Sequence, residues 1–378
     1  PSGDIAKFEV EWCQDRTFQG STYDSRETAQ KGFIISSLAA GKSYYVRVTA
    51  IDANQQRGAT SDILEVVTAP SGKVTGLKQT KAEDKKITLS WKKVTGANAY
   101  EIRYLKSNGT GKRVDVVTGN TASYKLTKSI AADTKYSVVI IPIRKSGGSK
   151  PFYARGVNLS DIKEMATKPK KITKLKFINS GTISGNTFKP EAKTAVFSWS
   201  KSNAAQGYEY TIYGKSGKKP LCKGTVKATA PNKGVRINNK KLTNTQFMRI
   251  SVKGYITVNK KKVYGKPSDI CWFAKNVSGI KAAKVGGRTV DAVKISWKKM
   301  SGAKNYTVYI AQGTYGKFKK VGTTSKTSYT VSKFNGSKFS SGTYYYKVVA
   351  SKKNGKKTVK SDDWNNKGFR ITTTYTYY

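Results

Sequence analysis

Apolar and polar residues alternate along short stretches of this chain, which is the pattern of half-buried β-strands. Three stretches share one plan: ITLSWKKVTGANAYEIRY (87–104), AVFSWSKSNAAQGYEYTIY (195–213) and VKISWKKMSGAKNYTVYI (293–310). Each predicts a strand ending in Ser-Trp, a polar turn, and a second strand beginning at Tyr. Successive tryptophans of these stretches are 108 and 98 residues apart, the length of a β-sandwich domain of about 100 residues. The repeat therefore predicts tandem sandwiches rather than helices.

A further alternating run follows in each repeat and also occurs near the start of the chain. The four runs are SYYVRVTAID (43–52), KYSVVIIPI (135–143), QFMRISVKGY (246–255) and TYYYKVVAS (343–351). They resemble the tyrosine corner and F strand of fibronectin type III domains, and the Ser-Trp and Tyr strands resemble the B and C strands of that family. The resemblance implies an all-β chain of four tandem fibronectin type III-like (immunoglobulin-like) sandwiches.

Short linkers that contain Pro or Gly separate the four domains. They are VVTAPSGKVTGLKQT, EMATKPKKITKLKF and WFAKNVSGIKAAK. We therefore expect domains over residues 1–70, 71–168, 169–275 and 276–378, called here the first to fourth domains. Linkers this short favour a semi-extended series of sandwiches over freely swinging ones.

The first domain is predicted to be incomplete. In FEVEW, the side chains of Phe8, Val10 and Trp12 should face a core, and Phe8 aligns with the tyrosine that begins strand C in the other domains. Strands C, C′, E, F and G are then expected, whereas A and B would precede Pro1. Such a domain exposes an inner face and an open edge. The missing strands can lie in an upstream segment separated by cleavage, or a neighbouring chain can donate them, or the domain tolerates their loss poorly, and we favour the first.

The aromatic residues divide into expected core and expected surface. Alternation points the strand tryptophans inward, and the family resemblance places the corner tyrosines beside them; this predicted core is Trp12, Trp91, Trp199, Trp297, Tyr44, Tyr136 and Tyr344. In the third domain Met248 occupies the corner position. Trp364, in a loop, either stacks on a sugar ring or covers the end of the sandwich, and we favour the second. Tyr378 is a candidate exposed aromatic residue.

The residue types present argue against catalysis. The chain has no His, which removes the commonest general acid/base and metal ligand. We expect no catalytic, metal or cofactor site, and no apolar run has the length of about 18 residues that a membrane span needs. Cys13 should point outward beside Trp12. The family resemblance implies that Cys222 and Cys271 lie on opposite edges of one sheet, too far apart for a disulfide.

Charge is the strongest functional signal. The chain carries a formal net charge of +49, with −2 on the first domain and +13, +20 and +18 on the next three. This excess is larger than the charge of about 2 to 8 that keeps a small domain soluble. It favours attraction of polyanions, although protection of strand edges by Lys is the simpler alternative. The candidate polyanion-binding lysines are Lys170, Lys171, Lys218, Lys219, Lys260, Lys261, Lys262, Lys352, Lys353, Lys356 and Lys357.

Together these features predict a non-catalytic extracellular array that presents lysines to an anionic polysaccharide, a teichoic acid or a host surface component. Lys outnumbers Arg about five to one, which disfavours sequence-specific nucleic acid as the partner. The array resembles the lysine-rich modules of secreted or cell-wall proteins of Gram-positive bacteria. Two alternatives remain open: an accessory region of a larger secreted carbohydrate-active enzyme, and a surface-assembly subunit completed by strand donation.

Overall fold

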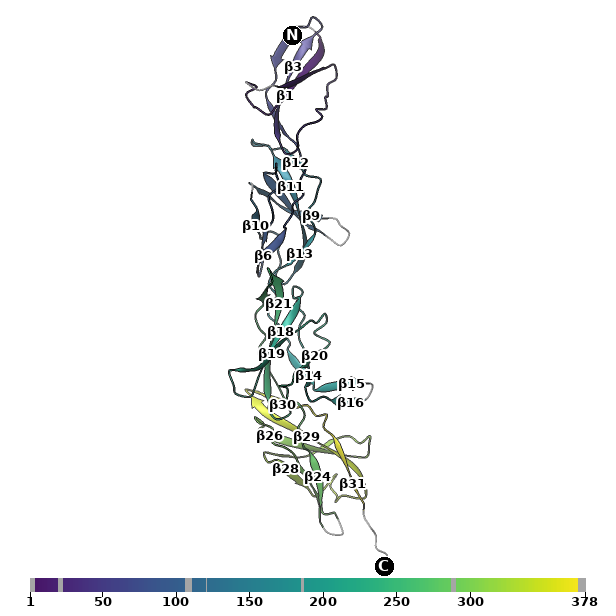
Figure 1. The fold of residues 1–378 in the computed structure, drawn as a ribbon. Coiled ribbons are helices and arrows are strands. Elements are labelled where there is room, and N and C mark those ends of the chain that lie inside the picture. The colour runs from purple at the N-terminus through teal and green to yellow at the C-terminus, as the bar shows by residue number, and fades with distance from the viewer. Residues whose placement is uncertain are drawn as a thin grey trace, which may run out of the picture. The chain divides into compact units, whose positions relative to one another are not determined.

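The computed structural model describes residues 4–19, 23–105, 111–119, 121–184, 187–286 and 290–372, and in these ranges every regular element is a β-strand (Figure 1). The chain packs as two compact units. One contains Pro1–Lys168 with Thr257–Val263, and the other contains Pro169–Ile256 with Tyr264–Tyr378. The predicted all-β class is confirmed.

The second domain is a complete two-sheet sandwich. Its smaller sheet has the order β10-β7-β6, and its larger sheet has the order β12-β11-β8-β9 with β13 also pairing β11. These sheets correspond to strands A, B, E and C′, C, F, G of a fibronectin type III-like domain. The strands are β6 (Lys78–Glu83), β7 (Lys86–Ser90), β8 (Ala99–Leu105), β9 (Gly111–Thr118), β10 (Ser123–Leu126), β11 (Lys135–Lys145), β12 (Tyr153–Arg155) and β13 (Lys163–Ala166).

The third domain has the same two sheets, ordered β14-β17-β20 and β19-β18-β21-β22 with β23 on β21, plus the hairpin β15-β16. This hairpin is an insertion between strands A and B. The strands are β14 (Lys176–Asn179), β15 (Gly181–Ser184), β16 (Thr187–Pro190), β17 (Thr194–Ser198), β18 (Gly207–Tyr213), β19 (Pro220–Val226), β20 (Val235–Asn238), β21 (Met248–Val258), β22 (Lys261–Tyr264) and β23 (Cys271–Phe273).

The fourth domain repeats the plan with the sheets β24-β25-β28 and β27-β26-β29-β30, and β31 also pairs β29. Its strands are β24 (Lys281–Val285), β25 (Ala292–Ser296), β26 (Asn305–Gln312), β27 (Lys319–Thr324), β28 (Ser328–Val331), β29 (Gly342–Asn354), β30 (Lys357–Lys360) and β31 (Lys367–Ile371).

In residues 4–19 and 23–70, the first domain forms the larger sheet alone, ordered β2-β1-β3-β4 with β5 on β3. Its strands are β1 (Ile5–Cys13), β2 (Asp24–Thr28), β3 (Ser43–Asp52), β4 (Arg57–Thr60) and β5 (Leu64–Val67). As predicted, strands A and B do not occur among the described residues of this domain. The expected strand E does not form either: residues 29–42 contain no strand. Strand E pairs with strand B in every complete domain, as β10 does with β7, so without B it has no ladder partner.

The tryptophan of strand B packs on the first tyrosine of strand C in each complete domain. The ring centres of Trp91 and Tyr100 are 5.2 Å apart, and those of the two later pairs are each 5.3 Å apart. The Tyr100 hydroxyl also accepts a hydrogen bond of 3.0 Å from the backbone N–H of Val94. One residue therefore fills the core and satisfies a buried donor of the B–C turn. This explains why the tyrosine follows the tryptophan by nine residues in each complete domain.

Candidate functional site

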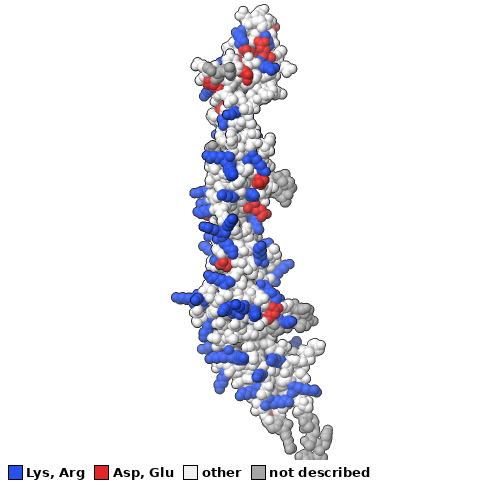
Figure 2. Space-filling model, viewed as in Figure 1, with Lys and Arg blue, Asp and Glu red and all other residues white. Residues whose placement is uncertain are grey.

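The candidate lysines lie in turns and at the starts of domains. Lys218 and Lys219 are in the β18–β19 turn, Lys260–Lys262 are at the β21–β22 turn, and Lys352–Lys357 span the β29–β30 hairpin. Lys170 and Lys171 precede β14. All these side chains are exposed except that of Lys352, which is half-buried. Figure 2 shows Lys and Arg spread over the face in view from the second domain onward, whereas acidic side chains gather mainly on the first domain.

The carboxylates of the third and fourth domains are engaged within the chain. Glu191, Glu209, Asp269, Asp291 and Asp363 each form an ion pair with a Lys or Arg, at nitrogen–oxygen distances between 2.6 and 3.5 Å. Hydrogen bonds, first from Thr182 and then from Arg236, lower the pKa of Glu191 to about 2. The sixth carboxylate, Asp362, is buried. Since these domains carry 44 basic residues and six acidic ones, most of their positive charge has no carboxylate partner within residues 169–378.

A serine followed by aspartate recurs in all four domains, where the last strand of the sheet is interrupted. In the fourth domain, Ser361 Oγ accepts a hydrogen bond of 3.0 Å from the backbone N–H of Ala350, and the Ser361 N–H donates back to the Ala350 carbonyl at 2.8 Å. The serine side chain thus replaces a missing backbone partner. The equivalent serines, with the same pair of hydrogen bonds, are Ser61, Ser160 and Ser268.

The aspartate of this pair has a different partner in the fourth domain. Asp161 and Asp269 form exposed ion pairs with Lys73 and Lys171, each at 2.7 Å. Asp362 is 7% exposed, and its Oδ2 accepts hydrogen bonds from the Ser180 N–H at 2.7 Å and the Ser180 hydroxyl at 2.6 Å. Burial raises the pKa of Asp362. This contact joins the third domain to the fourth.

A buried lysine lies at the same joint. Lys275 is 1% exposed, and its Nζ donates to the carbonyls of Glu191 and Ala192, each at 2.6 Å. Burial lowers its pKa to about 8, against the opposing effect of the Asp362 and Glu191 charges. Buried charged groups of this kind define one relative orientation of the elements around them, because any other orientation would leave them without partners.

The first and second domains are joined differently. The backbones of Gly41 and Gly96 approach so closely that a Cβ on Gly41 would lie 2.7 Å from the Gly96 Cα. Both residues have positive φ, 68° and 81°, which favours glycine. Half-buried side chains supply further bonds, such as those from the Gly147 N–H to Glu65 Oε2 at 2.8 Å and from Arg144 Nη2 to Ser43 Oγ at 3.0 Å.

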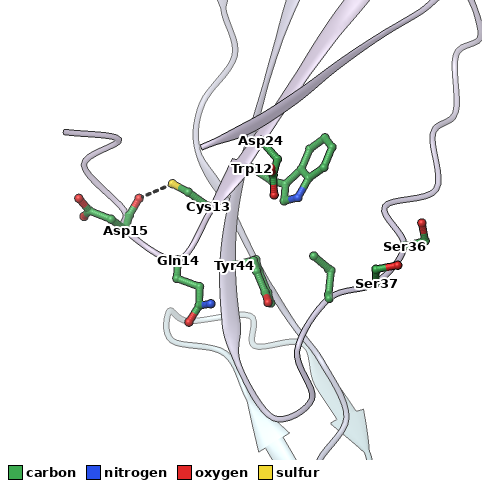
Figure 3. Close-up of a pocket in the computed structure, with 9 residues that line it drawn as sticks. Trp12, Cys13, Gln14, Asp15, Asp24, Ser36, Ser37 and Tyr44 are labelled. Atoms are coloured by element: carbon green, nitrogen blue, oxygen red, sulfur yellow. Dashed lines mark hydrogen bonds between the residues drawn. The ribbon is translucent and has the colours of Figure 1, made fainter. Parts of the chain in front are cut away.

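The inner face of the first domain is only partly covered. A hollow of about 320 Å³ is lined by Phe8, Val10, Phe33 and Val46 among others, and a second of about 510 Å³ lies around Trp12 and Tyr44 (Figure 3). Ile34, between Phe33 and Ile35 of the first hollow, is 87% exposed. Apolar side chains that the smaller sheet would cover in a complete domain therefore border solvent.

The expectation that Cys13 is a surface thiol is wrong, because its side chain is covered on the outer face of the sheet. Cys13 is 6% exposed, and its thiol donates to the Asp15 carbonyl at 2.9 Å (Figure 3). The chain after β1 folds back over the outer face of the sheet, where Phe18 packs beneath the Arg47 guanidinium. Alternation alone cannot reveal a loop that covers the second face.

Cys222 and Cys271 are half-buried free thiols, and burial raises the pKa of each.

The predicted core residues are buried, except Tyr136, which is half-buried. Trp91, Trp199 and Trp297 are 5%, 1% and 6% exposed. The corner hydroxyls of Tyr44 and Tyr136 accept from the N–H of Ala39 and Ala131 at 2.9 and 2.6 Å, and that of Tyr344 donates to the Ser340 carbonyl at 3.2 Å. In the third domain the buried Met248 takes the corner position without such a bond.

Trp364 lies in the loop between β30 and β31 and is 42% exposed. Tyr378 lies outside the described residues.

Within the described residues, no group of three His, Cys, Asp or Glu side chains is placed to hold a metal ion. The described part of the chain also has no helix long and apolar enough to cross a bilayer.

Neither a protein-family model nor a curated protein matches this sequence. Among solved structures, the chain is similar to the FN1–FN3 domains of chicken CNTN1, with 12% identity over 80% of this chain and 99% of that one, and a TM-score of 0.27. It is also similar to a two fibronectin type-III domain segment of chicken tenascin, with 15% identity over 53% of this chain and 99% of that one, and a TM-score of 0.26. Superpositions this weak carry no argument, so the assignment of tandem fibronectin type III-like sandwiches rests on the strand order within each domain.

Proposed function

We propose that this chain is a non-catalytic modular scaffold that presents a lysine-rich surface to an anionic cell-wall or host polymer. The observation that carries the proposal is the imbalance of charge in the third and fourth domains, where all six carboxylates are already engaged within the chain. A surface with this excess of cations attracts polyanions and gains affinity when bound counterions are released. The contacts between the first and second domains, and those between the third and fourth, support the role of a spacer.

The direct test is binding of the whole chain to immobilised teichoic acid and to heparin over a series of salt concentrations. We expect binding at low ionic strength that weakens steeply as salt is added. A variant with Lys260, Lys261 and Lys262 changed to Gln should bind more weakly than the parent. If the parent chain ignores both polymers at low salt, the proposal is wrong.

The proposed setting is outside the cell, secreted or attached to the wall of a Gram-positive bacterium. This part of the proposal is supported by the resemblance to lysine-rich wall modules. In an accessory region of a carbohydrate-active enzyme the same surface would hold the catalytic part near its polymer. The two roles are distinguished by sequencing the precursor polypeptide for a linked catalytic domain.

A second candidate function is supported by the uncovered inner face of the first domain. An added pair of β-strands from a second copy of this chain would pair with the segment around Ile34 and place alternate apolar side chains on Val10 and Val46. A concentration series by light scattering tests this candidate. Association should bury the apolar face and abolish binding of a hydrophobic dye, and a monomer at every concentration would exclude the candidate.

A further inference from the structure

Two cationic side chains, those of Arg249 and Lys352, lie against the Trp272 ring at the joint between the third and fourth domains. Trp272 on β23 lies directly opposite Arg249 on β21 in the antiparallel ladder, so their side chains share one face of the sheet. The Arg249 Cζ is 5.3 Å from the centre of the indole ring. The Nζ of Lys352, from β29 of the fourth domain, is 3.3 Å from the same ring centre. An indole attracts cations to its faces.

Arg249 is held in place by the turn beside it. Its Nε donates to the Gly214 carbonyl at 3.0 Å, and its Nη2 donates to the Gly217 carbonyl at 2.5 Å. These two bonds fix the β18–β19 turn, which carries Lys215, Lys218 and Lys219. They leave the other N–H groups of the guanidinium available to a ligand, because this side chain has five donors.

Lys352 is positioned by backbone contacts between the two domains. The Phe247 N–H donates to the Ser301 carbonyl at 2.9 Å, and the Ser301 N–H donates to the Thr245 carbonyl at 2.7 Å. A third bond of 3.0 Å runs from the Asp362 N–H to the Ala274 carbonyl, next to Trp272 in sequence. The cluster is thus assembled only when the two domains are docked.

The charges in this cluster repel one another. Burial, followed by the positive charges of Arg249 and Lys215, lowers the pKa of Lys352. Within the described residues, no ion pair joins Lys352, Arg249 or Lys215 to a carboxylate. Like charges held together at a fixed joint are stabilised by an anion that binds between them.

We propose that Trp272, Arg249 and Lys352 form a binding site for a tetrahedral oxyanion group of an anionic polymer, either a phosphodiester or a sulfate ester. The Arg249 guanidinium supplies directed N–H donors, Lys352 supplies charge, and the indole offers an apolar surface to the adjoining polymer backbone. The inference rests on the proposed function and adds to it one defined position at a domain joint. A chain attached only by diffuse charge would have no such position.

The test compares Lys352→Gln with Lys353→Gln in the full chain, by calorimetric titration with a short glycerol-phosphate oligomer and with a sulfated oligosaccharide. The two substitutions remove the same charge from adjacent positions, but Lys353 is exposed and is not part of the cluster. We expect about a tenfold loss of affinity for Lys352→Gln, the size of one lost charge-assisted contact, and less than a twofold loss for Lys353→Gln. The two probes distinguish phosphodiester from sulfate recognition.

Trp272 provides an independent readout. Binding should shift the indole N–H resonance of Trp272 in the parent chain, and Arg249→Lys, which keeps the charge but loses the guanidinium fork, should weaken binding several-fold. Circular dichroism checks that each variant stays folded. Equal losses for Lys352→Gln and Lys353→Gln would overturn the site and leave the proposed function standing. Failure of the parent chain to bind either probe or the longer polymers would overturn both.

Discussion

The first and fourth domains share the same larger sheet and differ in what covers it. In the fourth domain, the sheet β24-β25-β28 closes the sandwich over a core of 19 buried residues that also includes Phe247 and Ala274 of the third domain. In the first domain the comparable cluster has three buried residues, Val10, Trp12 and Tyr44. The larger sheet therefore forms without its partner, whereas a full core requires the second layer.

The largest expected difference between the two domains is in the stability lost when Trp297 or Trp12 is replaced by Ala. Trp297→Ala should destabilise the fourth domain by about 3–5 kcal/mol, because it leaves a cavity in a closed core. Trp12→Ala should cost about 1 kcal/mol, because the Trp12 side chain already borders a hollow and has fewer neighbours to lose. Amide hydrogen exchange in β29 and β3 of the full chain reports each local stability. Equal losses would mean that the first domain is closed in solution.

Asp62 and Asp362 occupy the same position in the first and fourth domains, so they allow a second comparison of the two domains. Asp62 is exposed, whereas Asp362 accepts two hydrogen bonds from Ser180. Asp362→Ala leaves two donors of Ser180 without partners in a buried joint, which should cost about 3 kcal/mol. Asp62→Ala should change stability by less than about 0.5 kcal/mol. Exchange rates in β31 and β5 measure the two effects, and a small effect at Asp362 would show that the joint is not closed.

These contrasts mark the limit of what the sequence predicts. The Trp-to-Tyr spacing predicts the complete domains because both residues belong to consecutive strands and meet locally. The failure of strand E in the first domain depends on a partner strand distant in the sequence. The Ser-Asp repeat is visible in the sequence, but the burial of Asp362 depends on the neighbouring domain. The cluster at Trp272 contains residues of both the third and the fourth domains, so only the fold brings Lys352 to the Trp272 ring.

The joint of the fourth domain should also respond to alkaline pH. Lys275 has a pKa of about 8 in the folded chain, below its ordinary value of 10.5. Between pH 8 and 10.5 the Lys275 amine is therefore protonated in the unfolded chain and neutral in the folded chain. Stability of the third and fourth domains should therefore rise by about 2–3 kcal/mol as pH increases from 8 to 10.5. In Lys275→Met this increment should vanish. Chemical denaturation of both chains across this range measures the difference, and parallel curves would contradict it.

The smallest expected effect tests whether the corner tyrosines act alike in the covered and uncovered domains. Tyr344→Phe removes the hydroxyl that donates to Ser340, and Tyr44→Phe removes the acceptor of the Ala39 N–H. Each change should cost about 1 kcal/mol, the net value of one hydrogen bond, because the ring itself stays in place. In the first domain water reaches the Ala39 N–H more easily through the hollow beside Trp12, so the loss there should be the smaller of the two. The exchange rate of the Ala39 amide reports directly how easily water reaches this N–H. A greater loss of stability in Tyr44→Phe than in Tyr344→Phe would mean that this corner, rather than the sparse core, holds the first domain together.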